Sequence, residues 1–493
     1  MSVVLGPAWA DTSGKPQTVL NPLRVQNHVT RMAAAFVPGV IATTTLARYY
    51  GLHPWLATVA VDRGLDRDGY LDLVRRCEVA LAWISAQHTD HVVDLPIAHG
   101  QEQLPRFTSG GVLDLQAASR PLAYVQNPSG FFGSTYGNSE MELGLLTADW
   151  APGPRFSDRA RVAVGSGLGA LLDLARNTTL TENAGKEAAA AGLCVCAARE
   201  GEEGSWLRDL LWGRLGGERW APLDDARRST ATLLTRVISH SATPVTDPVA
   251  AMRDALVYSG PLEQVPAAAG LEIAAAWRGL LLRHRAVTAW RQLWMEVVEE
   301  CVGITATEVA QRIAERFDDV SVADFIDALR TADGDRLLPA EETVSEEAPG
   351  VVGCVAVLAA VSQRVGQLDG VALDVLCGDD EAELGPRWMA AQLKAGRDYR
   401  LREWVAQRVT HLLERSQRVG LEKFRLDEHH RGIIPVQVRE RDGLWRKVNE
   451  TGSAPLNLRL RPLADVLAGC GILDHRNGIW SVTALGTELV AEP

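Results

Sequence analysis

The chain has 493 residues, of which 46% are hydrophobic and 23% are charged, and its formal net charge is −12 at pH 7. This length exceeds what one hydrophobic core normally organises, so we expect two to four domains, and the composition excludes general disorder. The acidic balance argues against a protein whose entire surface is coated by nucleic acid.

Three features of the sequence bear on its compartment. The stretch from Met1 to Pro7 has neither a basic segment nor a long apolar one, so we expect no secretory signal. No window approaches about 18 uncharged apolar residues, and the richest one, Val351 to Val361, indicates a buried helix rather than a membrane span. The seven cysteines are odd in number and scattered, as in reduced cytosolic proteins. The sequence therefore predicts a cytoplasmic protein with no membrane contact.

The first predicted domain, residues 1–150, mixes helices with loops that are rich in Gly and Pro. Apolar residues recur at helical spacing over 29–38 and 41–60, and the pattern over 69–88 is that of an amphipathic helix. The stretch 94–140 has the composition of a loop. We expect it to pack against the N-terminal helices or against a partner, because long structureless loops are uncommon in compact domains.

Four side chains at and beyond the end of the 69–88 helix have the chemistry of metal ligands: His88, His91, Asp94 and His99. Imidazole and carboxylate groups at such spacing suit a transition metal, as in a metal-dependent hydrolase or nuclease. Histidine is also common at helix C-termini, where its ring interacts with the helix dipole. The residues leave both interpretations open, and the sequence predicts no bound cofactor.

The second predicted domain, residues 151–330, contains two motifs that resemble functional sites. The segment 165–170, Gly-Ser-Gly-Leu-Gly-Ala, fits the dinucleotide-binding pattern G-x-G-x-x-G/A. The strand expected after it, 177–182, is too short and polar, so we predict a helix of small residues instead. Cys194 and Cys196 lack the two-residue spacer of redox and zinc pairs and lie in an Ala-rich run, which predicts buried thiols.

A long amphipathic helix over 271–302 comes late in this domain. Trp277, Trp290 and Trp294 lie on or beside its apolar stripe, and aromatic residues at this spacing usually form core. The acidic stretch 331–350, bounded by Pro and Gly, is the predicted linker to the last domain.

Basic residues concentrate in the last predicted domain, residues 351–493. From Arg397 to Pro462 the chain has 15 Arg and Lys against 9 Asp and Glu, so this stretch carries +6 and the remainder −18. Arginine forks suit phosphate oxygens, whereas a solvated helix face would pair the same arginines with neighbouring glutamates. A helix is predicted over 398–420. The candidate nucleic-acid contacts are Arg415, Arg418, Arg425, Arg431, Arg439, Arg441, Arg446, Lys447, Arg459, Arg461 and Arg476.

The segment 455–490 predicts a winged-helix-like unit. Apolar residues share one face of a short helix over 460–468, and Asn477-Gly478 is a strong signal for a two-residue hairpin because both positions tolerate positive φ. A final helix capped by Thr483 completes the order helix, strand, hairpin, strand, helix. Winged helices read DNA or dock proteins, and the few basic side chains here leave both roles open.

The sequence lacks the characteristic motifs of three enzyme classes. Only Lys15 and Lys186 follow a glycine, and neither precedes Ser or Thr, which excludes a Walker A loop. No lysine completes a Glu-x-Lys triplet, which excludes the usual PD-(D/E)xK nuclease core, and the Gly-x-Ser-x-Gly elbow of α/β-hydrolases is missing. The sequence leans away from catalysis and assigns no catalytic residue.

Three blocks of the sequence together resemble a group of known proteins. The blocks are Thr43 to Tyr50 leading to Trp55, Trp277 to Arg285 with Trp290 and Trp294, and Gly420 to Arg425. They resemble uncharacterised bacterial proteins encoded beside restriction and anti-phage defence genes. The resemblance implies a context, defence against foreign DNA, and brings no known catalytic residues. Within the first block, Arg48 beside two tyrosines fits a buried cation–π cluster or a stacking contact to a base, and we favour the structural interpretation.

Taken together, the sequence predicts a mainly α, multi-domain helical protein with a C-terminal winged-helix-like domain. Its predicted parts are 1–150, 151–330, the linker 331–350 and 351–493. The predicted function is that of a non-catalytic, nucleic-acid-associated scaffold or adaptor subunit in a bacterial complex, with other protein subunits and double-stranded DNA as partners. The alternatives are a metal-dependent hydrolase or nuclease built on His88 and His91, and a ligand-responsive transcriptional regulator.

Overall fold

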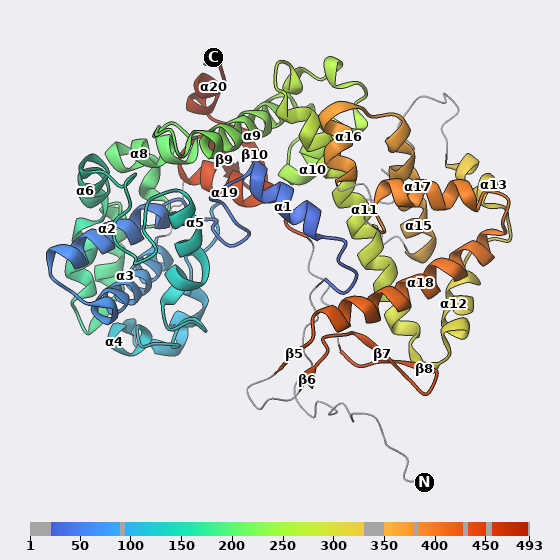
Figure 1. Ribbon diagram of the computed structural model, residues 1–493. Helices are drawn as coiled ribbons and strands as arrows, with labels where there is room; N and C mark the ends of the chain where they lie inside the picture. The colour runs from blue at the N-terminus through green and yellow to red at the C-terminus, as the bar shows by residue number, and fades with distance from the viewer. Residues whose placement is uncertain are drawn as a thin grey trace, which may run out of the picture. The chain divides into compact units, whose positions relative to one another are not determined.

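The computed structural model describes residues 21–88, 94–329, 350–378, 383–426, 432–449 and 456–491. The protein is mainly helical, as predicted (Figure 1). It divides into two compact units, and the last residues of the chain belong to the same unit as most of its first half. Unit 1 comprises Met1–Met32, Leu256–Gly260 and Ala275–Leu456, and unit 2 comprises Ala33–Ala255, Pro261–Ala274 and Asn457–Pro493.

Unit 2 is built mainly from helices. These are α2 (Tyr49–Asp62), α3 (Arg67–Gln87), α4 (Leu115–Ala118), α5 (Gly137–Glu142), α6 (Asp158–Ala175), α7 (Glu182–Ala190), α8 (Gly201–Leu211), α9 (Ala221–His240), α10 (Pro248–Arg253), α19 (Leu460–Gly469) and α20 (Ala484–Ala491). Its strands are β1 (Thr108–Ser109), β2 (Val112–Asp114), β3 (Thr179–Thr181), β9 (Leu473–Arg476) and β10 (Ile479–Val482). Shorter helical turns are η1 (Gln101–Phe107), η2 (Phe132–Tyr136), η3 (Ala197–Arg199), η5 (Leu262–Gln264) and η6 (Pro266–Ala268).

The core of unit 2 forms around α3, which packs against α2, α6 and α7, while α6 packs against α8. The helix predicted over 69–88 is confirmed as α3, and its first turn is capped by Asp66, whose carboxylate accepts a hydrogen bond from the backbone N–H of Gly69. The dinucleotide-like segment 165–170 lies inside α6, as the predicted helix of small residues. Gly167 has a packing reason, because a side chain there would overlap the carboxylate of Glu203 on α8.

Arg48, which precedes α2, is a buried hub of unit 2 with only 1% of its surface exposed. Its Nε and Nη2 donate to the two carboxylate oxygens of Glu203 at 3.0 and 2.8 Å. Its Nη1 donates to the carbonyls of Gly192 and Cys194, and Nη2 also donates to the carbonyl of Gly167. The guanidinium is thus held by one carboxylate and three carbonyls, and among the described residues it contacts no aromatic ring. Its burial also removes the alternative of a stacking contact to a base.

The C-terminal segment of unit 2 has the predicted order of elements: α19, the β9–β10 hairpin and α20. Asn477 and Gly478 form the turn with φ of 52° and 75°, in agreement with the sequence signal. Strands β9 and β10 pair antiparallel, with Leu473 opposite Val482. Thr483 Oγ1 accepts the backbone N–H of Gly486 at 3.0 Å, so it caps α20 as predicted.

The helix α19 is a core element of unit 2. Nine of its residues are buried, all except Arg461, and it packs against α8, α9 and α10. A DNA-reading helix needs a free face to enter a groove, and α19 has none while unit 2 is folded. The predicted order of elements is confirmed. The interpretation of the segment as a winged helix stays a prediction.

Unit 1 also consists mainly of helices. Those that lie wholly in it are α12 (Ala306–Ala314), α13 (Val322–Ala328), α15 (Gly350–Gln363), α16 (Gly370–Cys377), α17 (Pro386–Ala395) and α18 (Leu401–Glu422), with the turn η7 (Arg364–Gly366). Its strands are β4 (Val302–Ile304), β5 (Arg425–Leu426), β6 (Gly432–Ile433), β7 (Val438–Arg441) and β8 (Leu444–Lys447). Three elements contribute residues to both units: α1 (Asn27–Phe36), η4 (Asp254–Tyr258) and α11 (Ile273–Glu300).

The long helix α11 provides the aromatic core of unit 1. Trp277, Trp290 and Trp294 are at most 2% exposed, which confirms their prediction as core residues. The indole N–H of Trp290 donates to the carbonyl of Leu384 at 2.9 Å, so this buried polar group is satisfied. The segment predicted as a buried helix, 351–361, lies in α15.

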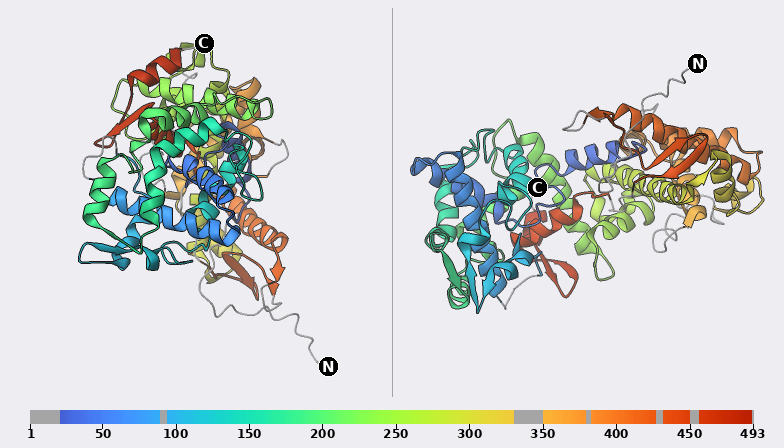
Figure 2. Two further views of the ribbon diagram at one scale, coloured as in Figure 1. Left: turned by 90° about the vertical axis from the view of Figure 1, so that its left-hand side faces the viewer. Right: turned by 90° about the horizontal axis from the view of Figure 1, so that it is seen from below.

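Helix α18 lies alongside α12 (Figure 1), and the strand β7 packs against α18, as Figure 2 also shows. The helix predicted over 398–420 is confirmed as α18, displaced by two or three residues at each end. The predicted linker 331–350 lies outside the described residues except for its last residue, which begins α15. Among the described helices, none combines the length and the apolar character needed to cross a membrane.

Candidate functional site

A three-stranded antiparallel sheet in unit 1, in the order β4-β8-β7, carries three of the predicted arginines. Arg439 on β7 lies directly opposite Arg446 on β8. Opposed residues of an antiparallel pair share a face, and so do residues two apart, so Arg441 lies on the same face as these two. Val438 and Trp445 on the other face are buried. The three arginines therefore face solvent, and we call them the arginine face.

Few negatively charged groups of the protein neutralise the arginine face. Among the described residues, no carboxylate pairs with Arg439 or Arg446, and Arg441 Nε lies 3.8 Å from Asp442 Oδ2 in a pair whose side chains are 81% and 90% exposed. Such an exposed pair contributes little, and like charges directly opposite each other destabilise a sheet. The neighbouring strand adds Val302, which lies opposite Arg446 and is 65% exposed. The face thus combines concentrated positive charge with one apolar contact.

Most of the other predicted basic residues bind groups of the protein itself. Their carboxylate or carbonyl partners are Glu383 for Arg415 and Arg418, Val37 for Arg459, Asp465 for Arg461, Asp474 for Arg476 and Glu299 for Lys447. Five of these six residues pair with a carboxylate, although Arg415 and Arg418 share that of Glu383, and Arg459 binds a neutral carbonyl. Arg425 is exposed in β5, and Arg431 lies outside the described residues.

A second candidate site lies in unit 2, where His88 meets Cys194 and Cys196. One ligand atom from each residue lies within 4.8 Å of the other two, and His88 Nδ1 is 3.1 Å from Cys196 Sγ. His88 directly follows α3, and the two cysteines belong to the loop between α7 and η3. Both thiols are buried, as the sequence predicts. The sequence reasoning missed their proximity to His88, because more than 100 positions separate the histidine from the cysteines along the chain.

The two thiols are electrostatically unequal. A hydrogen bond from the Cys196 thiol lowers the pKa of Cys194 to about 5, although burial opposes this shift, and His88 and Arg48 lower it further. The pKa of Cys196 is raised, first because its thiol donates that hydrogen bond and then because it is buried. Of the two thiols, Cys194 therefore loses its proton first.

The other predicted metal ligands lie elsewhere in unit 2 or outside the described residues. Asp94 is held by its backbone, whose N–H donates to the carbonyl of His475 at 2.7 Å. His99 stacks on Phe131 with ring centroids 4.6 Å apart. His91 is not among the described residues. Within the described part of the chain, the donor group that suits a metal ion contains His88 without Asp94 or His99.

A buried charge cluster lies in the core of unit 2. His53 is fully buried, with Nδ1 2.7 Å from Glu140 Oε1 and Nε2 3.0 Å from Glu78 Oε1. Burial by itself lowers the pKa of His53, but the two glutamates raise it to about 9. Glu78 also accepts the backbone N–H groups of Phe131 and Phe132. Both ring nitrogens are occupied and no surface is exposed, so the cluster is a structural one. No sequence motif signals it.

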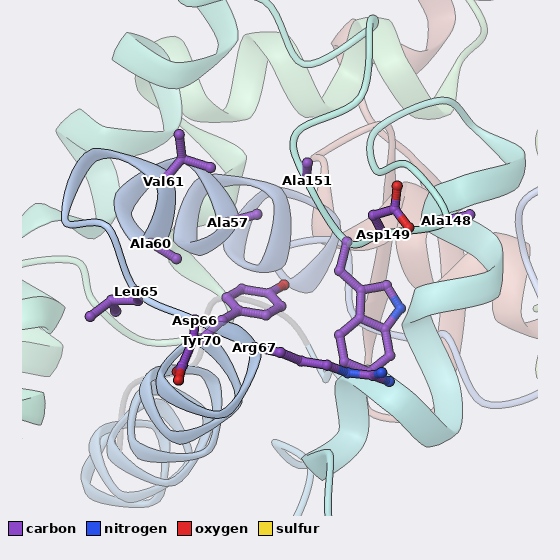
Figure 3. Close-up of a pocket in the computed structure, with 11 residues that line it drawn as sticks. Ala57, Ala60, Val61, Leu65, Asp66, Arg67, Tyr70, Ala148, Asp149 and Ala151 are labelled. Atoms are coloured by element: carbon purple, nitrogen blue, oxygen red, sulfur yellow. The ribbon is translucent and has the colours of Figure 1, made fainter.

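A pocket of about 340 Å³ opens in unit 2 between α2, the start of α3 and the loop before α6 (Figure 3). Its wall is both apolar and charged. The lining residues are Ala57, Ala60, Val61, Leu65, Asp66, Arg67, Tyr70, Ala148, Asp149, Trp150 and Ala151.

Two features distinguish this pocket from an ordinary surface depression. The Arg67 guanidinium lies 4.1 Å above the centre of the Trp150 ring, a cation–π contact at the wall of the pocket. Trp150 itself has φ of 63°, the left-handed region that bulky residues rarely adopt. Backbone strain of this kind clusters at ligand sites and costs about 1–3 kcal/mol. The pocket is large enough for a small planar ligand.

Comparisons with known proteins give no relative for this chain. No protein-family model matches it, and neither a curated protein nor a solved structure does.

Proposed function

We propose that the protein is a non-catalytic adaptor that contacts nucleic acid through the arginine face of unit 1. The observation that carries the proposal is the cross-strand pair Arg439–Arg446, which has no carboxylate partner among the described residues. The resemblance to proteins encoded beside anti-phage defence genes suits this role, in which the adaptor would work beside subunits that act on foreign DNA.

The arginine pair destabilises the hairpin of the free protein. Like charges directly opposite each other in a sheet cost about 0.2–1 kcal/mol. A phosphate group bound by both side chains reverses the sign of this interaction, because each guanidinium offers a planar fork that matches phosphate oxygens.

The charge of the rest of the chain limits this contact to one face. Outside Arg397 to Pro462 the chain carries −18, which repels a polyanion. We expect moderate, sequence-independent affinity that comes mainly from phosphate contacts. With three contacts, the logarithm of the association constant for duplex DNA should fall against the logarithm of salt concentration with a slope of about −3.

A salt titration with matched charge reversals tests the proposal. Fluorescence anisotropy with a labelled DNA duplex is compared for the wild type, Arg439→Glu/Arg446→Glu, and the control Arg176→Glu/Lys186→Glu, which changes the same charge on an exposed surface of unit 2. We expect the first variant to lose at least about tenfold in affinity and about two units of slope. Equal losses in both variants, or no binding by the wild type, would overturn the proposal.

A single substitution separates binding from structure. Arg439→Glu places a carboxylate opposite Arg446, so it should stabilise the hairpin by about 0.2–1 kcal/mol while it weakens DNA binding. Hydrogen exchange of the β7–β8 peptides measures the first effect, and anisotropy measures the second. If the arginine pair instead had a purely structural role, the substitution would reduce hairpin protection and leave DNA affinity unchanged.

The pocket in unit 2 supports a second candidate function, a regulator whose body binds a small planar ligand. The supporting observation is the strained backbone of Trp150 beneath the Arg67 guanidinium. Free nucleobases serve as planar probes in thermal-shift titrations. Stabilisation by a probe that is lost in Trp150→Leu and kept in Trp388→Leu, a change in unit 1, would favour the regulator. No stabilisation by any nucleobase would remove it.

A further inference from the structure

The His88, Cys194 and Cys196 cluster in unit 2 lies outside both proposed binding surfaces. Its three side chains supply the donor set of a thiophilic metal site: two sulfurs and one imidazole nitrogen. Zinc binds sulfur at about 2.3 Å and nitrogen at about 2.0–2.1 Å in a tetrahedron, so its ligand atoms lie about 3.5–3.8 Å apart. The observed separations of at most 4.8 Å, with 3.1 Å between His88 and Cys196, bracket this spacing. Only small side-chain movements separate the observed cluster from a metal-binding geometry.

The loop that carries the cysteines is fixed by contacts that do not involve a metal. The backbone N–H of Val195 donates to Ser85 Oγ on α3 at 3.1 Å. The carbonyl of Cys194 accepts from Arg48, and so does the carbonyl of Gly192 at 2.8 Å. The first bond ties the loop to the end of α3, the element that positions His88, and the other two tie it to Arg48. The donors are therefore brought together before any ion binds, which lowers the cost of binding.

We propose that His88, Cys194 and Cys196 bind one zinc-class ion. The donor set selects the class of ion, because thiolates favour zinc and other soft or borderline metals, whereas calcium and magnesium require oxygen ligands. Two thiolates balance the charge of a divalent ion, so the complex is neutral and suits a buried site. Among the described residues, the donor group has three members, each offering one ligand atom.

Cobalt substitution tests the site on the full-length chain. The protein is stripped with a chelator under anaerobic, reducing conditions and then titrated with Co²⁺. We expect one Co²⁺ per chain, with thiolate-to-cobalt charge-transfer bands, the intense visible bands of tetrahedral cobalt, and displacement by Zn²⁺. Elemental analysis of the Zn²⁺-loaded protein should give the same stoichiometry.

Matched variants assign the ligands. Cys194→Ser and Cys196→Ser should weaken Co²⁺ binding by more than the roughly 10–100-fold loss typical of changes around a metal site. The control Cys470→Ser changes another buried thiol of unit 2 and should keep both affinity and spectrum. His88 is only half-buried, so His88→Gln should leave the fold intact, which circular dichroism checks, while it weakens binding and shifts the visible bands. His88→Cys should restore tight binding with stronger charge-transfer bands.

Three results would overturn the proposal. One is the absence of stoichiometric Co²⁺ binding by the folded wild type. Another is a cobalt spectrum that Cys194→Ser, Cys196→Ser and His88→Gln all leave unchanged. The third is a Cys194–Cys196 disulfide that persists in protein prepared under reducing conditions, detected by peptide mass spectrometry, because its sulfurs are unavailable to a metal.

Discussion

Arg48→Met is the substitution for which the structure gives the sharpest expectation. Arg48 and Glu203 form a buried ion pair with side chains 1% and 5% exposed. Among the described residues, Arg48 is the hydrogen-bond partner of the Glu203 carboxylate, so its removal leaves a buried charge unpaired. Breaking such a pair costs about 3–5 kcal/mol. The three carbonyls that Arg48 binds add to this loss. Since a domain is typically stable by about 5–15 kcal/mol, unit 2 should become marginal.

Two buried cysteines provide a local assay. Cys77 lies in α3 of unit 2 and Cys301 follows α11 in unit 1, and both are at most 1% exposed. Alkylation of each thiol is followed against urea concentration by peptide mass spectrometry, so Cys77 reports on unit 2 and Cys301 serves as the internal reference. We expect Arg48→Met to lower the unfolding free energy at Cys77 by about 3–5 kcal/mol and to change it much less at Cys301.

A double variant tests the reason for the loss. In Arg48→Met/Glu203→Leu both charges are replaced by apolar groups, and such replacement of a buried pair is often neutral or stabilising. We expect the double variant to recover more than half of the stability that Arg48→Met loses. The reasoning is refuted if the double variant is no more stable than Arg48→Met, or if Arg48→Met costs less than about 1 kcal/mol.

Three further predictions concern unit 2. The pKa of His53 is raised from its ordinary value of 6.5 to about 9 in the folded protein. The charged ring therefore stabilises the fold fully below pH 6.5, and this stabilisation is lost as the pH rises to about 9. The loss should be of the order of 3 kcal/mol in urea titrations at a series of pH values, and a flat profile over this window would contradict a charged His53. Gly213→Ala should be far more destabilising in thermal melts than Gly216→Ala. Both glycines have positive φ, but only at position 213 would the added Cβ lie 2.5 Å from the carbonyl oxygen of Asp224. Equal losses of stability in the two variants would argue against this clash. Thr483→Ala should lower the hydrogen-exchange protection of α20 by about 0.5–2 kcal/mol, and Thr483→Ser should preserve it. Equal protection in both variants would show that the Thr483 hydroxyl does not stabilise α20 as a cap.

Several elements follow from local sequence alone. The helical spacing of apolar residues located α3, α11 and α18 to within a few residues, because the 3.6-residue period of a helix is written directly in the chain. Asn477-Gly478 located a hairpin because few other residue pairs tolerate two positive φ angles. Each of these signals concerns groups a few residues apart. The burial of Trp277, Trp290 and Trp294 was likewise predictable from their spacing.

The partners of the polar side chains were decided by the tertiary structure. Arg48 binds Glu203 across 155 positions and His88 meets Cys196 across 108, and no local pattern indicates either contact. The same limit applies to α19, whose apolar face is readable from the sequence, while its enclosure by α8, α9 and α10 is not. Periodicity and turn chemistry are local and therefore legible in the sequence. Which arginine meets a carboxylate, and which stays exposed on the arginine face, depends on the packing of distant elements.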